Sequence, residues 1–275
     1  MSTGEATTRR APRPGARVLS DGHVIYWWVE ILAVAAFYVV YSFVRNLNGG
    51  GGGAVPADAL ANARQIIDLE RSLGIYHELT IQRWALEWRP LIIAANYFYG
   101  SLHFIVTISA GVFLYRRFSD DYPLFRNTLA IATASALVGF TLYPLAPPRL
   151  LGDALGAGYE YVDTLLRDPA IWSFNSGGMQ KISNQFAAMP SVHICWATWS
   201  ALALAPRCRR SWTRALAIAY PIATLVVIVI TANHYFLDAV GGLAILGFGW
   251  VVARHVTRAG RSAVTAGNRP DRPAV

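Results

Sequence analysis

Six apolar runs constrain the fold of this chain more than any other feature of its sequence. They cover residues 24–44, 90–115, 124–146, 190–206, 212–232 and 234–253. A helix of about 20 apolar residues crosses the ~30 Å hydrocarbon core of a bilayer. Only 15% of the residues are charged, whereas soluble domains carry about 25%. The sequence therefore predicts an all-α, polytopic membrane protein: a six-transmembrane-helix bundle forming one domain over residues 24–255.

The first apolar run has two interpretations, a retained membrane anchor or a signal peptide. Val55-Pro56-Ala57 loosely resembles a cleavage site, which suits a signal peptide. The run is too long for a signal h-region, however, and it contains Glu30, so a retained anchor is favoured. The polar segments 1–23 and 256–275 are predicted to be disordered cytoplasmic tails.

The segment between the first two runs is predicted to lie on the membrane surface. Residues 46–56 form a glycine-rich linker, and Asp58 can cap a helix that ends at Gly74. Trp84 and Trp88 are four residues apart, as expected for a helix at the membrane interface. The apolar positions predicted to share one face of the first helix are Ala59, Ala63, Ile66, Leu69 and Leu73.

Arginines between the runs predict the orientation in the membrane. Short cytoplasmic loops are enriched in Lys and Arg. Most arginines of this chain fall in its tails and in two of the short loops: Arg9, Arg10, Arg13, Arg17, Arg116, Arg117, Arg126, Arg207, Arg209, Arg210, Arg214, Arg254, Arg258, Arg261, Arg269 and Arg272. Both termini are therefore predicted to be cytoplasmic, and segments 45–89 and 147–189 to be extracytoplasmic.

Charge and cysteine content argue against two other classes of protein. The net charge of +8 is spread over short clusters between apolar runs, without the basic stripe typical of a nucleic-acid-binding protein. Cys195 and Cys208 lie in or beside one run, and no CxxC or Cys/His finger spacing is present. Neither nucleic-acid binding nor a disulfide framework is therefore indicated.

The first of three polar clusters ends at Arg149. The sequence Tyr143-Pro-Leu-Ala-Pro-Pro-Arg149 follows the third apolar run. Its prolines cannot continue a helix, so they predict an extended exit that holds Arg149 at the membrane surface. A guanidinium there can bind two phosphate oxygens at once. A snorkelling interfacial arginine is the alternative.

The second and third clusters contain histidines. Ser191 and His193 open the fourth run, where free helix N–H groups favour an anion; a helix cap and a buried histidine are the alternative. His234 and Asp238 are four residues apart, so the carboxylate can orient the imidazole and leave its other nitrogen as a nucleophile. A structural ion pair, or a metal site with His193, are the alternatives. The predicted topology brings all three clusters to one membrane face.

Pro190-Ser-Val-His193 followed by His234-x-x-x-Asp238 resembles two signature motifs of the type 2 phosphatidic acid phosphatase superfamily. Tyr235 and the Ala-Pro-Pro-Arg149 stretch are more similar to its inositol phosphorylceramide synthase-like, inositolphosphotransferase-like branch. The resemblance implies a six-helix bundle and a mechanism without metal or other cofactor. It implies that His234 attacks phosphorus, Asp238 orients it and His193 protonates the leaving oxygen. Arg149 and Ser191 then hold phosphate oxygens.

The chain departs from the superfamily pattern at two positions. Leu142 stands where the pattern has a lysine, and Ile228 stands where it has an arginine. Lys181 and Arg167, in the outer loop, are candidates to replace the missing charges, and we include Lys181 and Asn233 with the substrate-binding residues. His103 lies near mid-membrane, and we interpret it mainly as a core histidine.

The sequence therefore predicts an integral membrane lipid-phosphate phosphatase or phosphotransferase that acts at the extracytoplasmic face of the cell membrane. Its partner is a membrane lipid carrying a phosphate group. The long outer segments also suit a second substrate, an alcohol or polyol acceptor. The alternative is a catalytically weak lipid-binding or transport-associated protein, which the two missing cations favour and the retained histidines disfavour.

Overall fold

The structure is a computed structural model that describes residues 15–47, 55–155, 158–168 and 185–267. Within these residues the chain is almost entirely helical, and its one sheet is a two-stranded hairpin. The elements are β1 (Ala16–Val18), β2 (Val24–Tyr26), α1 (Trp27–Leu47), α2 (Ala57–Ser72), α3 (Glu78–Leu86), α4 (Arg89–Tyr97), the π-helical turn η1 (Phe98–Leu102), α5 (His103–Arg117), α6 (Tyr122–Leu142), η2 (Pro148–Leu150), α7 (Gly152–Leu155), α8 (Thr164–Arg167), α10 (Val192–Leu204), η3 (Ala205–Arg207), α11 (Ser211–Ile230) and α12 (Phe236–Gly267).

Four helices of the described residues are long and apolar enough to cross a membrane. They are Arg89–Arg117, which joins α4, η1 and α5, and then Tyr122–Leu142, Ser211–Ile230 and Phe236–Ala259. They match four of the six predicted runs and confirm a membrane-embedded helical protein. The other two runs form α1, which is apolar over Trp27–Phe43, and α10, which has only 13 residues. The count of six spans stays a prediction.

The ends of the chain differ from the predicted tails. Ala16–Val18, which belong to the segment 1–23 expected to be disordered, pair with Val24–Tyr26 in the β1–β2 hairpin, and Tyr115 of α5 donates a hydrogen bond to the carbonyl of Ile25 over 3.2 Å. At the other end, α12 continues to Gly267, beyond the predicted start of the C-terminal tail. Backbone pairing and helix continuation thus order segments whose polar composition suggested disorder.

Glu30 interrupts the apolar α1, and the fold neutralises it. Its carboxylate is buried and accepts hydrogen bonds from Arg126 over 2.6 Å and from the Tyr122 hydroxyl over 3.0 Å. Both partners lie on α6, so this ion pair fastens α1 to the bundle. An acid in an apolar helix is costly unless it is paired, and here the pairing removes that cost.

The buried face of α2 matches the predicted one at Ala59, Ala63 and Ile66 but differs from it towards the end of the helix. Leu69 and Leu73 are 48% and 57% exposed, whereas Glu70 is fully buried. Ala59, Ala63, Ile66 and Ile67 complete the buried face. Gly74 ends the helix as predicted, because its positive φ of 70° turns the chain back. The rotation of α2 directs a carboxyl into the interior.

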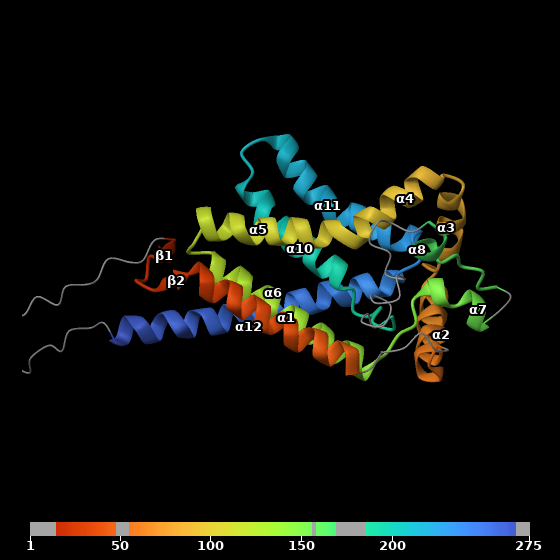
Figure 1. Ribbon diagram of the computed structural model, residues 1–275, viewed down its shortest axis with the longest axis horizontal. Helices are drawn as coiled ribbons and strands as arrows, with labels where there is room; N and C mark the ends of the chain where they lie inside the picture. The colour runs from red at the N-terminus through yellow and green to blue at the C-terminus, as the bar shows by residue number, and fades with distance from the viewer. Residues whose placement is uncertain (1–14, 48–54, 156–157, 169–184, 268–275) are drawn as a thin grey trace, which may run out of the picture.

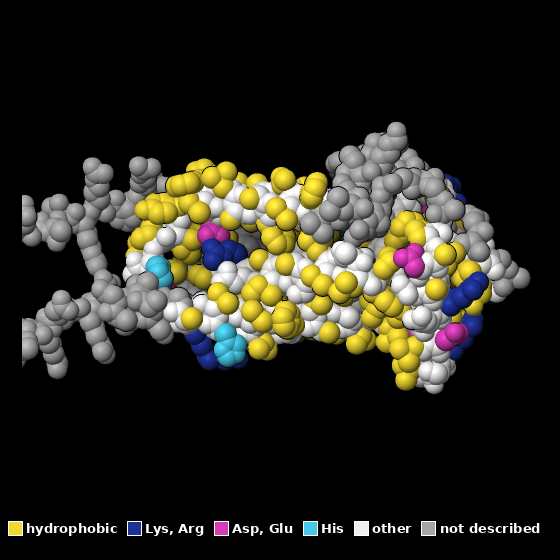
Figure 2. Space-filling view, turned by 90° about the horizontal axis from the view of Figure 1, so that it is seen from below, with side chains coloured by type: hydrophobic (Ala, Val, Ile, Leu, Met, Phe, Trp, Pro, Cys, Tyr) yellow, Lys and Arg dark blue, Asp and Glu magenta, His cyan; other side chains and the backbone are white. Residues whose placement is uncertain are grey.

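The two ends of the molecule hold different parts of the chain (Figure 1). Both described chain ends lie at the left of the long axis, whereas α2, α3, α7 and α8 gather at the right, which we call the site end. Between them the long helices run side by side, with α12 packed along α6. Figure 2 shows a mostly hydrophobic and uncharged middle, with charged side chains towards the two ends. This distribution suits a bundle that crosses a membrane.

Glycines bring α12 close to its neighbours. A Cβ on Gly242 would clash with the carbonyl oxygen of Ser191, at the start of α10. A Cβ on Gly249 would lie 2.8 Å from the carbonyl oxygen of Thr128 on α6. Only glycine permits such contacts, so these two positions determine how closely α12 approaches α10 and α6.

Candidate active site

The turn between α11 and α12 carries the predicted nucleophile. The N–H groups of Asn233 and His234 both donate to the carbonyl of Ile228, which folds the turn back on α11. Ala232 adopts a positive φ of 53°, a conformation that non-glycine residues seldom adopt outside tightly constrained sites. The turn is fully packed, with Ala232 0% exposed. His234 is therefore presented on a rigid corner.

Asp238 orients the His234 ring. Its Oδ2 atom lies 3.2 Å from Nδ1 of His234 and accepts a hydrogen bond of 2.9 Å from the N–H of Tyr235. Its carbonyl accepts the N–H of Ser191 over 2.9 Å, which ties the turn to the start of α10. A carboxylate at Nδ1 stabilises the tautomer with hydrogen on that atom and leaves Nε2 as a nucleophile. The predicted pairing of these residues is present.

His193 faces His234 across the site, with 5.6 Å between the ring centroids. Its ring stacks on Tyr99 at 4.3 Å and meets the edge of His103 at 4.5 Å. Its buried Nε2 atom has no hydrogen-bond partner among the described residues. A nitrogen in that state can exchange a proton with a bound substrate.

His103 belongs to this cluster rather than only to the core. The π-helical turn η1 precedes it, and its Nδ1 lies 3.0 Å from the carbonyl oxygen of Tyr99. The place of His103 in its apolar run predicts a core residue near mid-membrane but does not predict its contact with His193. A π-helical turn has no simple sequence pattern, although such turns occur often at functional sites.

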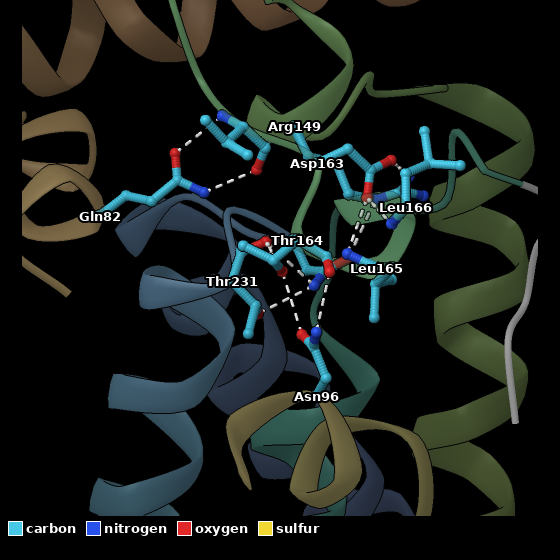
Figure 3. A network of polar contacts seen from close by, with 10 residues as sticks. Gln82, Asn96, Arg149, Asp163, Thr164, Leu165, Leu166 and Thr231 are labelled. Carbon is cyan, nitrogen blue, oxygen red and sulfur yellow. Dashed lines mark hydrogen bonds and ion pairs between the residues drawn. The ribbon is translucent and has the colours of Figure 1, made fainter. Parts of the chain in front are cut away.

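Arg149 is held beside the turn by three contacts. Its backbone N–H donates to the carbonyl of Ala232 over 2.8 Å, and its side-chain Nε donates to Oδ1 of Asn233 over 3.0 Å. Its Nη1 forms an ion pair of 2.6 Å with Asp163 (Figure 3). The side chain is only 11% exposed. An arginine fixed near the turn that carries His234 was predicted, and the structure has this arrangement. Asn233 links Arg149 to that turn.

Asp163 is a site residue that the sequence analysis missed. One of its oxygens caps α8 by accepting the N–H groups of Leu165 and Leu166, and the other binds Arg149. Figure 3 shows the next residue, Thr164, bonded to Asn96 below the turn. An aspartate before a short helix indicates a cap, but no local pattern indicates its distant arginine partner.

Ser191 caps the N-terminus of α10, two residues before His193. Its Oγ accepts the N–H of Ile194 over 3.5 Å, and the residue is fully buried. His193 lies in the first turn that this cap begins, as predicted. Pro190 precedes the cap and therefore lies outside the helix. The hydroxyl proton of Ser191 is available to an acceptor.

The positions of the missing cations are apolar in the structure. Ile228 is fully buried in a cluster with Ile194, and Leu142 is 77% exposed. Of the proposed replacements, Arg167 pairs with Asp168 over 2.7 Å, and Lys181 lies outside the described residues. In the described part of the chain, Arg149 is thus the cation bonded to the turn that carries His234, and Asp163 balances its charge.

The acidic and imidazole groups do not form a metal-binding arrangement within the described residues. No group of three or more His, Cys, Asp or Glu side chains there is placed to hold an ion. The metal site of His193, His234 and Asp238, weighed from the sequence, therefore has no support. The expectation that no cofactor takes part stays a prediction.

The arrangement combines an oriented imidazole, a second imidazole, a fixed guanidinium and a helix N-terminus, a set suited to transferring a phosphoryl group. The PAP2 superfamily, whose characteristic activity is that of a phosphatase, matches residues 64–252. No curated protein and no solved structure matches the chain at a significant level. The match includes Arg149, His193, His234 and Asp238 and covers more than half of the sequence, so the chain belongs to the PAP2 superfamily.

Proposed function

We propose that this chain is an integral membrane lipid-phosphate phosphatase or phosphotransferase that works through a phosphohistidine. One observation carries the proposal: Asp238 binds Nδ1 of His234, whose ring faces His193. An imidazole whose Nδ1 is held by a carboxylate presents Nε2 as a nucleophile or as a base, and attack on phosphorus is the use that we propose for it here. An ion pair that served stability alone would need no second imidazole facing it.

Two steps account for the proposed reaction. In the first, Nε2 of His234 bonds to phosphorus, the bond to the leaving oxygen breaks, and His193 donates a proton to that oxygen. In the second, water or an alcohol attacks the phosphohistidine, His193 takes its proton, and the nitrogen–phosphorus bond breaks. Asp238 stabilises the positive imidazole in both steps. The enzyme returns to its initial state.

Arg149, Ser191 and Asn233 supply the proposed substrate-binding contacts. Phosphoryl transfer is promoted mainly by positioning and by groups that stabilise charge on the phosphate oxygens. Nε and Nη1 of Arg149 are bonded to Asn233 and Asp163, which fixes the direction of the guanidinium and leaves Nη2 for a phosphate oxygen. Lys181 is proposed as a further phosphate-binding cation.

An apolar groove supports a lipid substrate. It has a volume of about 490 Å³ and lies between α6 and α12, lined by Ser135, Val138, Ala244, Ile245 and Phe248. Val138 is adjacent in sequence to Gly139, whose missing Cβ would meet Pro190 beside Ser191. An acyl chain in this groove would leave its phosphate close to the start of α10.

We further propose six spans with the site on the extracytoplasmic side and both termini in the cytoplasm. The 21 residues of α1 are long enough for the ~30 Å apolar core, since each adds 1.5 Å. In Figure 1, α1 and α10 run among the other long helices, and the chain ends lie opposite the site end. The distribution of arginines supports the assignment of sides.

A transferase of the inositol phosphorylceramide synthase-like branch is the proposed form of this activity. Its second substrate, an alcohol or polyol, would enter through the segments that surround the site end. Tyr161 does not line such an entrance, because it is buried and its hydroxyl bonds to that of Tyr76 over 3.0 Å. We expect acceptor alcohols to divert the intermediate from water, as measured by product partitioning from a radiolabelled lipid phosphate.

The test of the proposed function uses the purified full chain in detergent, with a panel of lipid phosphates and a strong chelator. Wild type should turn over at least one lipid and acquire an acid-labile, alkali-stable phosphate label. His234→Ala should abolish both, and Asp238→Asn should reduce turnover by about 10²–10⁴-fold. His255→Ala, an exposed position on α12, is the matched control. Near-normal turnover by His234→Ala would exclude the covalent mechanism.

A catalytically weak lipid-binding or transport-associated protein is the second candidate. The observation that favours it is the low positive charge near the turn, where Ile228 is apolar and Asp163 neutralises Arg149. In that case the purified chain should bind lipid phosphates without releasing product, and His234→Ala should bind them equally well. The same lipid panel, with bound lipid quantified, distinguishes the two functions.

A further inference from the structure

Two fully buried glutamates contact the first turn of α12. Glu70 of α2 accepts the N–H of Leu237 over 2.7 Å, and Glu78 of α3 accepts the N–H of Phe236 over 3.1 Å. The preceding N–H, that of Tyr235, bonds to Asp238. Three consecutive backbone N–H groups directly after His234 are thus held by carboxyl groups. The positive end of the helix dipole favours negative charge at this place.

The second oxygen of each glutamate has no hydrogen-bond donor beside it among the described residues. Oε2 of Glu70 and Oε2 of Glu78 are both buried without a hydrogen-bond partner among the described residues. The two carboxyls lie within hydrogen-bonding reach of each other. If both were ionised, two acceptors would face each other with no donor between them. A single proton supplies that donor, and the pair keeps one negative charge for the helix N-terminus.

The groups around the pair support this protonation. The ionisable neighbours of Glu70 are Glu78 and Asp238, both acidic, while the hydroxyls of Tyr76 and Tyr235 also face the pair. Burial, the hydrogen bond with Glu78 and these charges raise the pKa of Glu70 to about 9, although the N–H of Leu237 opposes the shift. Glu70 lies outside the membrane-spanning helices.

We propose that Glu70 and Glu78 are positioning residues that, by sharing one proton, hold the first turn of α12 and thereby keep His234 and Asp238 in the reactive arrangement. The proposal rests on the function proposed above, since positioning matters only if this pair reacts. Loss of the proton would leave the carboxylates of Glu70 and Glu78 facing each other beside that of Asp238. Their repulsion would displace the first turn of α12.

The expected pH dependence of stability follows from the raised pKa of Glu70. A carboxyl whose pKa is raised on folding stabilises the folded state fully below its unfolded pKa, near 4.5, and loses that contribution as pH rises to about 9. Wild type should therefore lose thermal stability over this range and lose turnover above about pH 9. Glu70→Gln should make thermal stability less dependent on pH and should abolish the loss of turnover above about pH 9. The reason is that its amide donates permanently to Glu78.

The experiment compares Glu70→Gln, Glu78→Gln and their double variant in the full chain. Each single variant keeps one donor and one anion, so turnover should stay within about threefold of wild type. The double variant has two facing amide groups and no acceptor between them, so turnover should fall more than tenfold, far beyond the product of the single effects. Glu87→Gln, an exposed position directly after α3, is the matched control and should behave as wild type.

Melting temperature between pH 5 and 10 supplies a readout that does not depend on turnover. If wild type turns over no lipid phosphate, the proposed function fails, while a flatter pH dependence for Glu70→Gln still demonstrates the shared proton. The positioning proposal is overturned if Glu70→Gln follows the wild-type pH dependence of the melting temperature. It is equally overturned if the double variant is as active as either single variant.

Discussion

At the scale of single residues, the balance of charge at Arg149 governs the site. The guanidinium is bonded to Asn233 and paired with Asp163, and both members of the ion pair are about one-tenth exposed. Removing one partner of a buried pair leaves the other charge uncompensated, which is costly. A bound phosphate would compensate the same charge. Under the proposed function, Asp163 therefore compensates the charge of Arg149 when no phosphate is bound.

Asp163→Asn should make stability depend on phosphate. Asparagine retains the cap of α8, but it leaves Arg149 without a counter-ion, so the unliganded protein should lose about 3 kcal/mol of stability. Inorganic phosphate should then raise the melting temperature of the variant more than that of wild type. Thermal unfolding in detergent, with and without phosphate, measures both effects.

Glu160→Gln is the control for this change, because it removes an ion pair of similar length with Arg83 whose two side chains are more than half exposed. Such surface pairs contribute about 0–1 kcal/mol, so little change is expected. An equal phosphate response in Asp163→Asn and wild type would show that Asp163 does not compete with substrate charge.

At the scale of helices, the close contact of α12 with α10 positions the histidines. Gly242→Ala would place a methyl group against the carbonyl oxygen of Ser191 and would push the start of α10 away from Asp238. We expect a loss of about 1–3 kcal/mol in stability, as for other overpacked contacts, and a fall in turnover at unchanged expression. Calorimetry and the lipid-phosphate assay measure the two losses.

Gly247→Ala on the same helix is the matched control, because no atom lies within 4 Å of its Cβ position. Alanine there should stabilise α12 by roughly 0.5–1 kcal/mol, since glycine is a poor helix former. If both alanine variants behaved alike, the contact of Gly242 with Ser191 would be irrelevant to the site.

Local patterns predicted the helices well and their burial less well. The runs at 90–115 and 212–232 match helices, because hydropathy over 20 residues is a strong local signal. The face of α2 was misassigned, because leucines at 69 and 73 suggested burial that Glu70 has instead. The Glu70 carboxyl can be buried there because it accepts a hydrogen bond from the distant N–H of Leu237 on α12. Sequence periodicity contains no information about such a partner.

Within the site, local patterns likewise predicted some residues, whereas contacts between distant residues could not be predicted. His193, His234 and Asp238 could be predicted, because their spacing is a local pattern and the polar residues interrupt apolar runs. Asp163 could not, because its partner Arg149 depends on how the intervening chain folds back. The positive φ of Ala232 could not be predicted either, since alanine rarely adopts it.

At the scale of the whole molecule, orientation in the membrane decides which leaflet supplies the substrate. Ser72 is exposed at the site end, and Ser211 is exposed at the start of α11. With Cys195 and Cys208 replaced, a single cysteine at position 72 should react with an impermeant thiol reagent in intact cells, and one at position 211 should not. Lysed cells, in which both should react, provide the control. The reverse labelling pattern would place the site in the cytoplasm.

The order of the site residues along the chain has a consequence for synthesis. The contact between Glu70 and Leu237 joins residues 167 positions apart, and that between Arg149 and Asn233 joins residues 84 apart. The ribosome therefore completes Glu70 and Arg149 long before His234, the proposed nucleophile. A nascent or truncated chain that stops before α12 has Arg149 and Asp163 but no His234. In the proposed mechanism such a chain cannot form the bond to phosphorus, and turnover would begin only when the last helix has entered the membrane.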